Sequence, residues 1–274
     1  MKETFLVMAL RNAAKRIPLG LGFALAVAFP HLNATANEVN LGAANNYAVL
    51  AGTTITDTGS TTIKNGNIGV SPGSAITGLG YITLSGGAVD MADAAGAQLA
   101  LAAAYTTAAG LAVTEDLTST PELGGLTLTP GVYHFSSSAD LTGTLTLNDL
   151  GNPDAVFVFQ IGTSLTTAGA VVTINDPSST PGTSVFWQVG SSATLGTATA
   201  FEGNILAADS ITLVTGSTDL DGRLLAETGA VTLDTDTITA PPAEVPDTGS
   251  ALLLLGAGLA ALFAFGRRFS ALLG

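Results

Sequence analysis

The phrase Ala193-Thr194-Leu195-Gly196-Thr197-Ala198-Thr199 returns twice further along the chain, as Ile211-Thr212-Leu213-Val214-Thr215-Gly216-Ser217-Thr218 and as Val231-Thr232-Leu233-Asp234-Thr235-Asp236-Thr237. Its leucines, Leu195, Leu213 and Leu233, are separated by 18 and then 20 residues. A repeat of this length is too short for a helical hairpin, and it is typical of one coil of a β-solenoid. The stretch Ala193–Ala240 therefore predicts a solenoid whose coils stack the same phrase on itself.

Hydroxyl side chains are expected to line up along such a stack. Residues i and i+2 share a strand face, and neighbouring strands lie about 4.7–4.9 Å apart. The pairs Thr197/Thr199, Thr215/Ser217 and Thr235/Thr237 are therefore predicted to form two parallel columns of hydroxyl and methyl groups. Thr58-Gly59-Ser60-Thr61 repeats Thr215–Thr218 letter for letter, so a coil near the N-terminus is predicted to carry the same surface.

Charge and cysteine content narrow the possible functions. Between Asn37 and Ala240 only two residues are basic, Lys64 and Arg223, against 18 acids, so this span has a formal charge of −16. Nucleic-acid binding needs clustered Lys and Arg to neutralise phosphates, and the span lacks them. An acidic, self-repelling surface is typical of a soluble protein. The chain has no cysteine, so disulfides and thiolate metal sites are excluded.

The N-terminal residues 1–36 have the pattern of an export signal. A basic start precedes an apolar run from Ile17 to Pro30, and the small-residue site Ala34-Thr35-Ala36 follows. Cleavage after Ala36 would leave Asn37 as the new N-terminus. The alternative is a retained membrane anchor, but the apolar run is short for a membrane span.

One stretch, at about residues 88–113, interrupts the solenoid pattern. It is rich in Ala and contains no Pro, which predicts a helix lying close against the sheet. The helical face is predicted to consist of Met91, Ala94, Ala95, Gln98, Leu99, Ala102, Tyr105 and Ala109. Beyond it, Val132–Phe135, Val156–Gln160 and Val185–Val189 are near-continuous apolar runs, as expected of strands buried on both faces or packed under the helix.

The C-terminus has the pattern of a sorting tail. Residues 241–250 form a linker that ends in the motif Val245-Pro246-Asp247-Thr248-Gly249, and residues 251–274 contain an apolar run followed by Arg267-Arg268. This tail resembles the bacterial signals read by exosortases, and also those read by sortases, although Val245 stands where sortase signals have Leu. A plain C-terminal anchor predicts a similar cell-surface location. Membrane contact is therefore predicted only through the terminal segments.

Five further phrases connect the middle of the chain with a known family. They are Asn46–Gly52, Gly69–Gly73, Gly124–Tyr133, Val156–Gly162 and Phe186–Gly190. Together they resemble the ice-binding protein family with a discontinuous β-solenoid, over roughly Leu41 to Ala240. The resemblance implies a mainly β domain at residues 37–240, with a right-handed triangular β-solenoid and one long α-helix packed alongside. It also implies a monomer without cofactor or metal, whose partner is an ice crystal surface.

By the same resemblance, one flat solenoid face binds ice, and some members carry a Thr-[Ala/Gly]-x-[Thr/Asn] phrase there. The phrase is complete at Thr58–Thr61 and at Thr215–Thr218, and Asp236 interrupts it. Threonine is also simply a good strand residue, but its repetition on distant coils and the family match favour ice contact. The predicted ice-contacting residues are Thr58, Ser60, Thr61, Thr142, Thr144, Thr167, Thr197, Thr199, Thr215, Ser217, Thr218, Thr235 and Thr237.

Two other classes of function stay open. A sugar-cleaving enzyme or a calcium site could use Asp219/Asp221 or Asp234/Asp236, although such pairs in repetitive coils are usually solvated turns. An adhesin or stalk module could use the solenoid only as a spacer. The sequence favours an exported, surface-attached ice-binding protein that performs no reaction, with the adhesin as the alternative.

Overall fold

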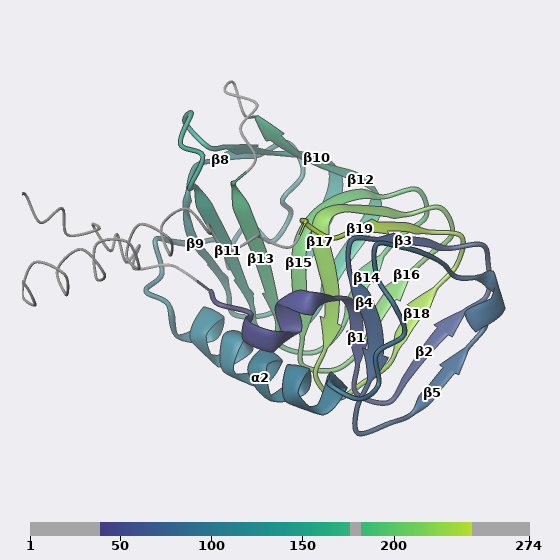
Figure 1. The fold of residues 1–274 in the computed structure, drawn as a ribbon. Helices are drawn as coiled ribbons and strands as arrows, with labels where there is room; N and C mark the ends of the chain where they lie inside the picture. The colour runs from purple at the N-terminus through teal and green to yellow at the C-terminus, as the bar shows by residue number, and fades with distance from the viewer. Residues whose placement is uncertain (1–38, 176–181, 243–274) are drawn as a thin grey trace, which may run out of the picture. The chain divides into compact units, whose positions relative to one another are not determined.

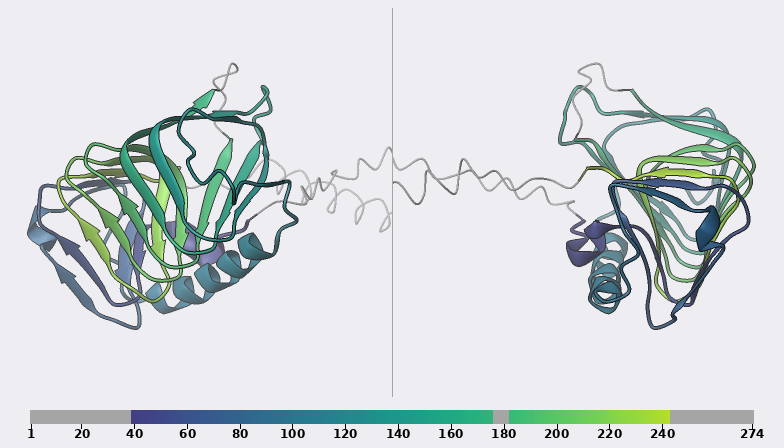
Figure 2. Two further views of the ribbon diagram at one scale, coloured as in Figure 1. Left: turned by 180° about the vertical axis from the view of Figure 1, so that it is seen from behind. Right: turned by 45° about the vertical axis from the view of Figure 1, so that its right-hand side comes forward.

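Parallel strand pairs join each turn of this chain to the next turn, as a solenoid requires. The computed structural model describes residues 39–175 and 182–242, and these form a coiled parallel sheet with one long helix beside it (Figure 1). Seen nearly along the coil axis, the coils have three sides (Figure 2). The prediction of a mainly β, solenoid-like fold with a single packed helix is confirmed.

We call the three sides face A, face B and face C. Several long strands bend at a corner and contribute to two faces. Face A contains β7 (Glu115–Asp116), β9 (Gly131–Phe135), β11 (Val156–Ile161), β13 (Ser184–Val189), the second halves of β15 (Ala200–Ala207) and β17 (Thr218–Ala226), β1 (Tyr47–Ala51) and β4 (Asn67–Val70). Face B contains the first halves of β10 (Ala139–Asn148) and β12 (Leu165–Asn175), then β14 (Ala193–Leu195), β16 (Ile211–Leu213), β18 (Val231–Leu233), β2 (Thr54–Asp57) and β5 (Ala75–Thr77). Face C contains β8 (Thr127–Leu128), the remaining halves of β10, β12, β15 and β17, then β19 (Thr237–Thr239), β3 (Thr62–Lys64) and β6 (Thr83–Ser85).

The order of the coils in space differs from their order in the sequence. The last C-terminal coil stacks on the first N-terminal coil: β17 pairs with β1, β18 with β2 and β19 with β3. The residues Val231 and Ile55, for example, are direct neighbours. In Figure 1 the purple strands near β1 therefore lie beside the yellow-green strands of the C-terminal coils. The N-terminal coils extend the stack, so Thr56 continues the same face as Thr232.

Apolar side chains fill the inside of the coils because alternate residues of every strand point inward. The leucine repeat of the sequence lies here, with Leu195 paired to Leu213 and both buried. Under face A, the rings of Phe159 and Trp187 stack with centroids 3.9 Å apart and an interplanar angle of 8°. Tyr133 lies against Phe159 at 5.5 Å on the neighbouring coil. The buried aromatic strands expected from the sequence therefore form the core under face A.

The helix α2 (Ala94–Gly110) covers face A, and short 3-10 segments, η2 (Gly42–Asn46) and η3 (Leu79–Tyr81), complete the structure. The helix is shorter than the predicted range 88–113, because Val89 still bridges to Ile68 of β4. The predicted face was largely wrong, since Leu99 is 77% exposed. The residues buried against the sheet are Ala94, Ala97, Leu101, Ala104 and Ala108. Gln160 holds the C-terminal end of α2 by donating from Nε2 to the carbonyl oxygens of Ala108 (2.8 Å) and Leu111 (3.0 Å).

The corner between faces B and C is a tight turn in each coil. The chain takes a left-handed conformation there, with φ of 77° at Gly216, 56° at Ala198 and 61° at Thr235. Glycine tolerates this conformation, whereas residues with a Cβ are strained in it. The second half of each repeated phrase, such as Thr215-Gly216-Ser217, is therefore a corner of the solenoid, whereas the first half is a short strand.

Candidate functional site

Face B presents a regular surface of hydroxyl groups. Its strands β14, β16 and β18 are three residues long, and each has one buried apolar residue on either side of a threonine that points outward. The strand registers align these outward threonines in one column across six neighbouring coils. The column consists of Thr166, Thr194, Thr212, Thr232, Thr56 and Thr77, with Asp140 at its end.

A second column of small residues runs beside the first one. Each of its members comes two residues before a column threonine and points the same way. The backbone N–H of Leu165 donates to the Ser192 carbonyl and that of Ala193 to the Ser210 carbonyl, which fixes the alignment. The column consists of Ser164, Ser192, Ser210, Ala230, Thr54 and Ala75. We call both columns together the hydroxyl surface.

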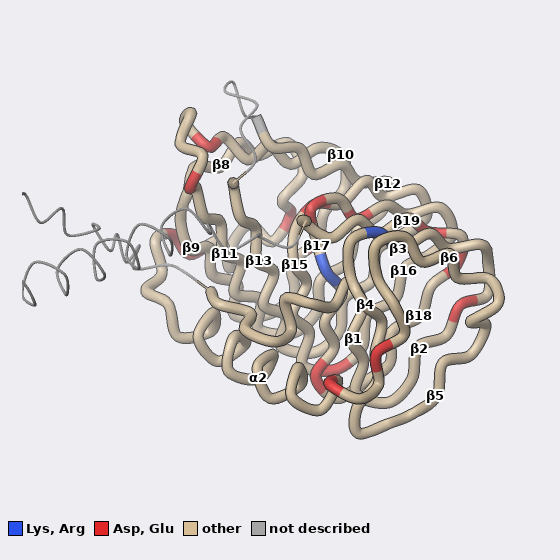
Figure 3. Tube along the Cα trace, in the orientation of Figure 1, with Lys and Arg blue, Asp and Glu red and all other residues tan. Residues whose placement is uncertain are grey.

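The hydroxyl surface is regular in both directions. Neighbouring coils are about 4.8 Å apart, and residues i and i+2 of a strand are about 6.6 Å apart. Threonine side chains hold a restricted set of rotamers because they branch at Cβ, so their methyl and hydroxyl groups keep their spacing. Strands β14, β16 and β18 carry no charged residue, and basic residues occur only in β3 and β17 among the described residues (Figure 3).

The predicted ice-contacting residues are spread over three environments. Thr61, Thr167, Thr199 and Ser217 are buried, and buried hydroxyls cannot reach a crystal surface. Thr58, Ser60, Thr142, Thr197, Thr215 and Thr235 are exposed, but at the corner between faces B and C. Thr144, Thr218 and Thr237 point outward on face C. The predicted pairs Thr197/Thr199 and Thr215/Ser217 therefore do not share a face.

The buried hydroxyls hold the corner turns together. The hydroxyl groups of Thr167 and Thr199 share a hydrogen bond of 2.8 Å. Ser217 donates from Oγ to the backbone oxygen of Gly196, on the neighbouring coil, at 2.9 Å. Thr61 donates from Oγ1 to Oδ1 of Asp57 at 2.9 Å. The repeated threonine phrase is thus partly structural, because it supplies partners to turn groups that would otherwise be buried without one.

Sequence reasoning missed the regular column of Thr56, Thr166, Thr194, Thr212 and Thr232. A signal for it was present, since each strand reads as apolar, Thr and then a buried residue, as in Ile211-Thr212-Leu213. Alternation of buried and exposed residues is the mark of a half-buried strand.

The two aspartate pairs do not form one site. In each pair one carboxyl is buried, at Asp219 and Asp236, while Asp221 and Asp234 lie toward the surface. The burial of Asp219 and Asp236 therefore contradicts the expectation that both pairs lie in solvated turns. Asp236 accepts from the backbone N–H of Ser217 (2.9 Å) and of Asp234 (2.7 Å), and burial raises its pKa to about 6. Residues 39–175 and 182–242 contain no group of three or more His, Asp or Glu that could hold a metal ion.

Burial also raises the pKa of two carboxyls near the corner of faces C and A. Asp219 points into the core, where neither of its oxygens has a hydrogen-bond partner, and desolvation raises its pKa well above its usual value. Glu202 lies outward on β15, and burial raises its pKa to about 7, with a further contribution from the charge of Asp221. Neither arrangement resembles an acid and base pair facing a common cleft.

Known proteins are similar to this chain in both sequence and fold. The family described as ice-binding-like matches residues 49–239, which is most of the described solenoid. The chain belongs to this family. It is 51% identical over 241 residues to an ice-binding protein of Nostoc sp. (strain HG1), an alignment that covers 84% of this chain and 87% of that one. It is 39% identical over 220 residues to an ice-binding protein of Colwellia sp., which covers 74% and 84% of the two chains.

Solved structures of ice-binding proteins have a similar fold. The crystal structure from the Antarctic ascomycete Antarctomyces psychrotrophicus superposes with a TM-score of 0.68 at 36% identity, covering 75% of this chain and 99% of that one. The structure from an Antarctic biological consortium gives 0.67 at 38% identity, covering 82% and 96%. These similarities agree with the predicted family and solenoid.

The tail matches a second family, described as the VPDSG-CTERM motif, over residues 244–269. The predicted motif Val245-Pro246-Asp247-Thr248-Gly249 and the apolar run 251–274 lie outside the described residues, as does the predicted signal 1–36. A sorting motif of this kind indicates a protein of the cell surface or exterior. In the part of the chain that the structure describes, no helix is long and apolar enough to cross a membrane.

Proposed function

We propose that this chain binds ice, and that the hydroxyl surface of face B makes the contact. The observation that carries this proposal is the alignment of Thr166, Thr194, Thr212, Thr232 and Thr56 on consecutive coils. The relatives named as ice-binding proteins support the activity itself. Their names do not identify a face, so the choice of face B rests on the geometry of this chain.

The other two faces are less suited to a flat contact. Face A is covered by α2 and by the segment that contains η2. Face C carries Lys64 and Glu202 on its outer side, and the side chain of Leu220 is 49% exposed there. Charged and bulky side chains hold water in orientations that do not repeat from coil to coil. Face C also aligns Thr218, Thr237, Thr62 and Thr83 in one column, but the column beside it contains Leu220 and Lys64. The hydroxyl surface of face B consists of two neighbouring columns of small side chains.

The physical basis of binding is the order of water on the hydroxyl surface. Methyl groups restrict the neighbouring water, and hydroxyl groups fix it by hydrogen bonds. Immobilising one bridging water requires about 0–2 kcal/mol, and water that is already ordered on the protein loses less entropy when it joins a crystal. Many weak contacts on one rigid face then add up to firm adsorption, which slows ice growth or recrystallisation. This activity requires no reaction and no cofactor.

The two ends of the chain support a location outside the cell. Residues 1–36 have the pattern of an export signal, and the tail matches a sorting motif. We infer that a sorting enzyme of the exosortase type processes the tail near Val245–Gly249, and that the solenoid acts as a monomer. Expression with residues 245–249 deleted tests this step. The chain is then expected in the medium, and retention at the surface would contradict the inference.

The test of face B compares matched substitutions on the three environments. Thermal hysteresis and recrystallisation inhibition are measured for the full chain and for Thr212→Tyr, Thr239→Tyr and Thr215→Tyr. Tyrosine is compatible with strands, so circular dichroism should show folded variants. Thr212 is central on face B, and its replacement is expected to abolish most activity. Thr239 has the same half-exposure on face C, and its replacement is expected to leave activity unchanged.

The corner variant separates the two candidate surfaces. Thr215 belongs to the predicted phrase and lies beside face B, and we expect its replacement to reduce activity less than that of Thr212. Loss with Thr239→Tyr and retention with Thr212→Tyr would move the contact to face C. An inactive parent chain would overturn ice binding and favour a spacer or adhesin.

A further inference from the structure

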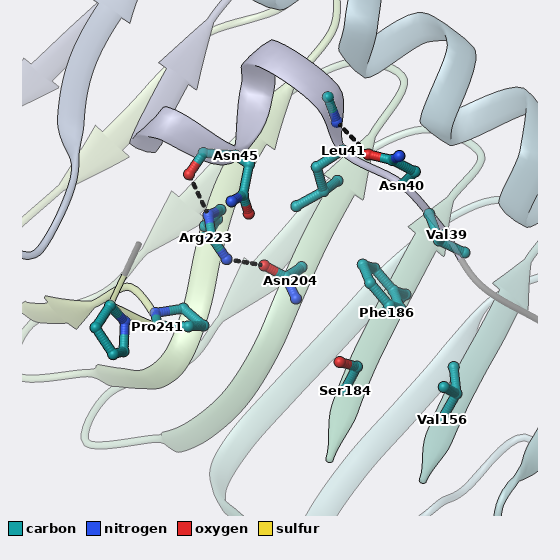
Figure 4. A pocket seen from close by; sticks show the side chains of 12 residues that line it. Val39, Asn40, Leu41, Asn45, Val156, Ser184, Phe186, Asn204, Arg223 and Pro241 are labelled. Atoms are coloured by element: carbon teal, nitrogen blue, oxygen red, sulfur yellow. Dashed lines mark hydrogen bonds between the residues drawn. The ribbon is translucent and has the colours of Figure 1, made fainter. Parts of the chain in front are cut away.

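A cavity of about 420 Å³ opens on the outer side of face A, away from the hydroxyl surface. Strands β11, β13, β15 and β17 form its floor, and the segment before and within η2 forms one wall (Figure 4). Pro241 and Pro242, where the described chain ends, form another wall. Its volume is in the range of small-molecule sites, which is about 300–1,000 Å³.

A buried cation, Arg223, lines this cavity. Its side chain is only 3% exposed. Nε donates to the backbone oxygen of Asn45 at 3.2 Å, and Nη1 donates to Oδ1 of Asn204 at 3.0 Å (Figure 4). A guanidinium has five N–H donors, so three of them have no acceptor among the described residues. Burial lowers the pKa of Arg223 to about 10, which leaves it cationic at neutral pH.

The charge of Arg223 has no close counterion among the described residues. Asp219 is the acid whose charge acts on it, but no ion pair joins the two side chains. The Asp219 carboxyl lies in the core, where desolvation favours its neutral form. Buried charges are normally paired, because an isolated one loses its hydration without compensation. An anion in the cavity would restore that balance.

We infer that this cavity is a carboxylate-binding site in which Arg223 is the anchoring cation. The planar guanidinium matches a carboxylate through two parallel hydrogen bonds. The cavity offers a single positive charge, and the span from Asn37 to Ala240 has a formal charge of −16, so a monoanion fits better than a phosphate dianion. Leu41, Phe186 and Val156 add apolar walls that suit a short aliphatic chain.

The carboxylate can come from this chain or from solution. Both ends of the described chain border the cavity, at Val39 and at Pro242. In the sequence, Glu38 directly precedes Val39, and Glu244 follows two residues after Pro242. Either acid therefore lies within two residues, along the sequence, of a residue that lines the cavity. A free small carboxylate would use the same donors.

Butyrate is a suitable probe, with butyramide as its neutral control. Ligand-observed NMR and thermal unfolding are followed for the full chain, for a Glu38→Gln/Glu244→Gln variant and for Arg223→Gln in each background. A free ligand is the source if butyrate binds saturably to the parent chain. The chain itself is the source if butyrate binds only after both glutamates are replaced.

In either case Arg223→Gln is expected to weaken butyrate binding roughly ten- to hundredfold, as the loss of a charge-assisted pair predicts. Arg223→Lys keeps the charge without the planar fork and covers the case in which Arg223→Gln does not fold. It is expected to bind butyrate more weakly than the parent. Butyramide is expected not to bind. Absence of saturable butyrate binding in both the parent and the double glutamate variant would overturn the inference, and so would equal binding of butyramide. Ice binding does not depend on this cavity, so the result of the butyrate experiment does not bear on the proposed ice-binding function.

Discussion

Replacing Glu202 by glutamine is expected to stabilise the protein at alkaline pH and not at acid pH. Burial raises the pKa of this carboxyl from 4.5 to about 7 in the folded chain. The folded state therefore binds more protons than the unfolded state between these values, and stability falls as the pH rises through this window. Below about pH 4.5 the carboxyl is protonated in both states, and it contributes no such penalty.

The size of the effect follows from the shift. At 1.36 kcal/mol per pKa unit, raising the pKa from 4.5 to about 7 corresponds to about 3 kcal/mol. Glu202 is partly exposed, and solvent screening reduces this to about 1–2 kcal/mol. For a domain of this size, 1 kcal/mol moves the Tm by about 2–4 °C. Glu202→Gln should therefore raise the Tm at pH 8 by roughly 2–8 °C relative to the parent.

The assay is thermal unfolding of the full chain at pH 4 and pH 8. Glutamine has nearly the same size and shape as glutamate, so the substitution changes mainly the charge. Glu115→Gln is the matched control, because Glu115 is exposed on β7. A gain at pH 4 equal to that at pH 8 would refute the reasoning, and so would the same gain in the Glu115 control.

Three further substitutions test other parts of the structure. Asp219→Asn removes a buried carboxyl whose pKa is raised by desolvation. The urea midpoint of the variant should therefore exceed that of the parent at pH 8, and the two midpoints should agree at pH 3. A lower midpoint for the variant at pH 8 would contradict this prediction. Trp187→Ala opens the aromatic stack and should reduce the unfolding free energy by about 3–5 kcal/mol, and Trp187→Phe by clearly less; equal losses would contradict the stacking account. Gln160→Leu removes the donor to the last carbonyls of α2 and should destabilise by about 1–3 kcal/mol, with faster amide exchange at the end of α2; unchanged exchange there would exclude the capping role.

The solenoid could be predicted from the sequence because the residues that repeat are the buried ones. Leu195, Leu213 and Leu233 recur at coil length and occupy equivalent inward positions. The aromatic strands were recognisable as continuous apolar runs for the same reason, since α2 covers their outer side. The pairing of β17 with β1 could not be predicted, because no local sequence pattern indicates which coils are neighbours in the stack.

The columns of the hydroxyl surface were harder to predict than the fold. A three-residue strand has only one outward residue, so the sequence pattern around Thr212 is weaker than the longer phrase Thr215–Thr218 that follows it. The left-handed turn at Ala198 and Thr235 has no glycine to mark it. The face of α2 was unreadable for a related reason, since alanine occurs on every side of the helix and Ala97 and Ala102 look alike in sequence. Burial of Asp219 likewise has no sequence signal, because its neighbours in the inward column, Phe201 and Ile238, belong to other coils.

Ice partition is the measurement that tests the central claim most directly. The full chain, Thr212→Tyr and Thr239→Tyr are each frozen slowly around a cold probe, and the fraction of protein incorporated into the ice is determined. Contact through the hydroxyl surface predicts that the parent and Thr239→Tyr enter the ice, whereas a folded Thr212→Tyr stays in the liquid. Equal incorporation of Thr212→Tyr and the parent would contradict the assignment of ice binding to face B.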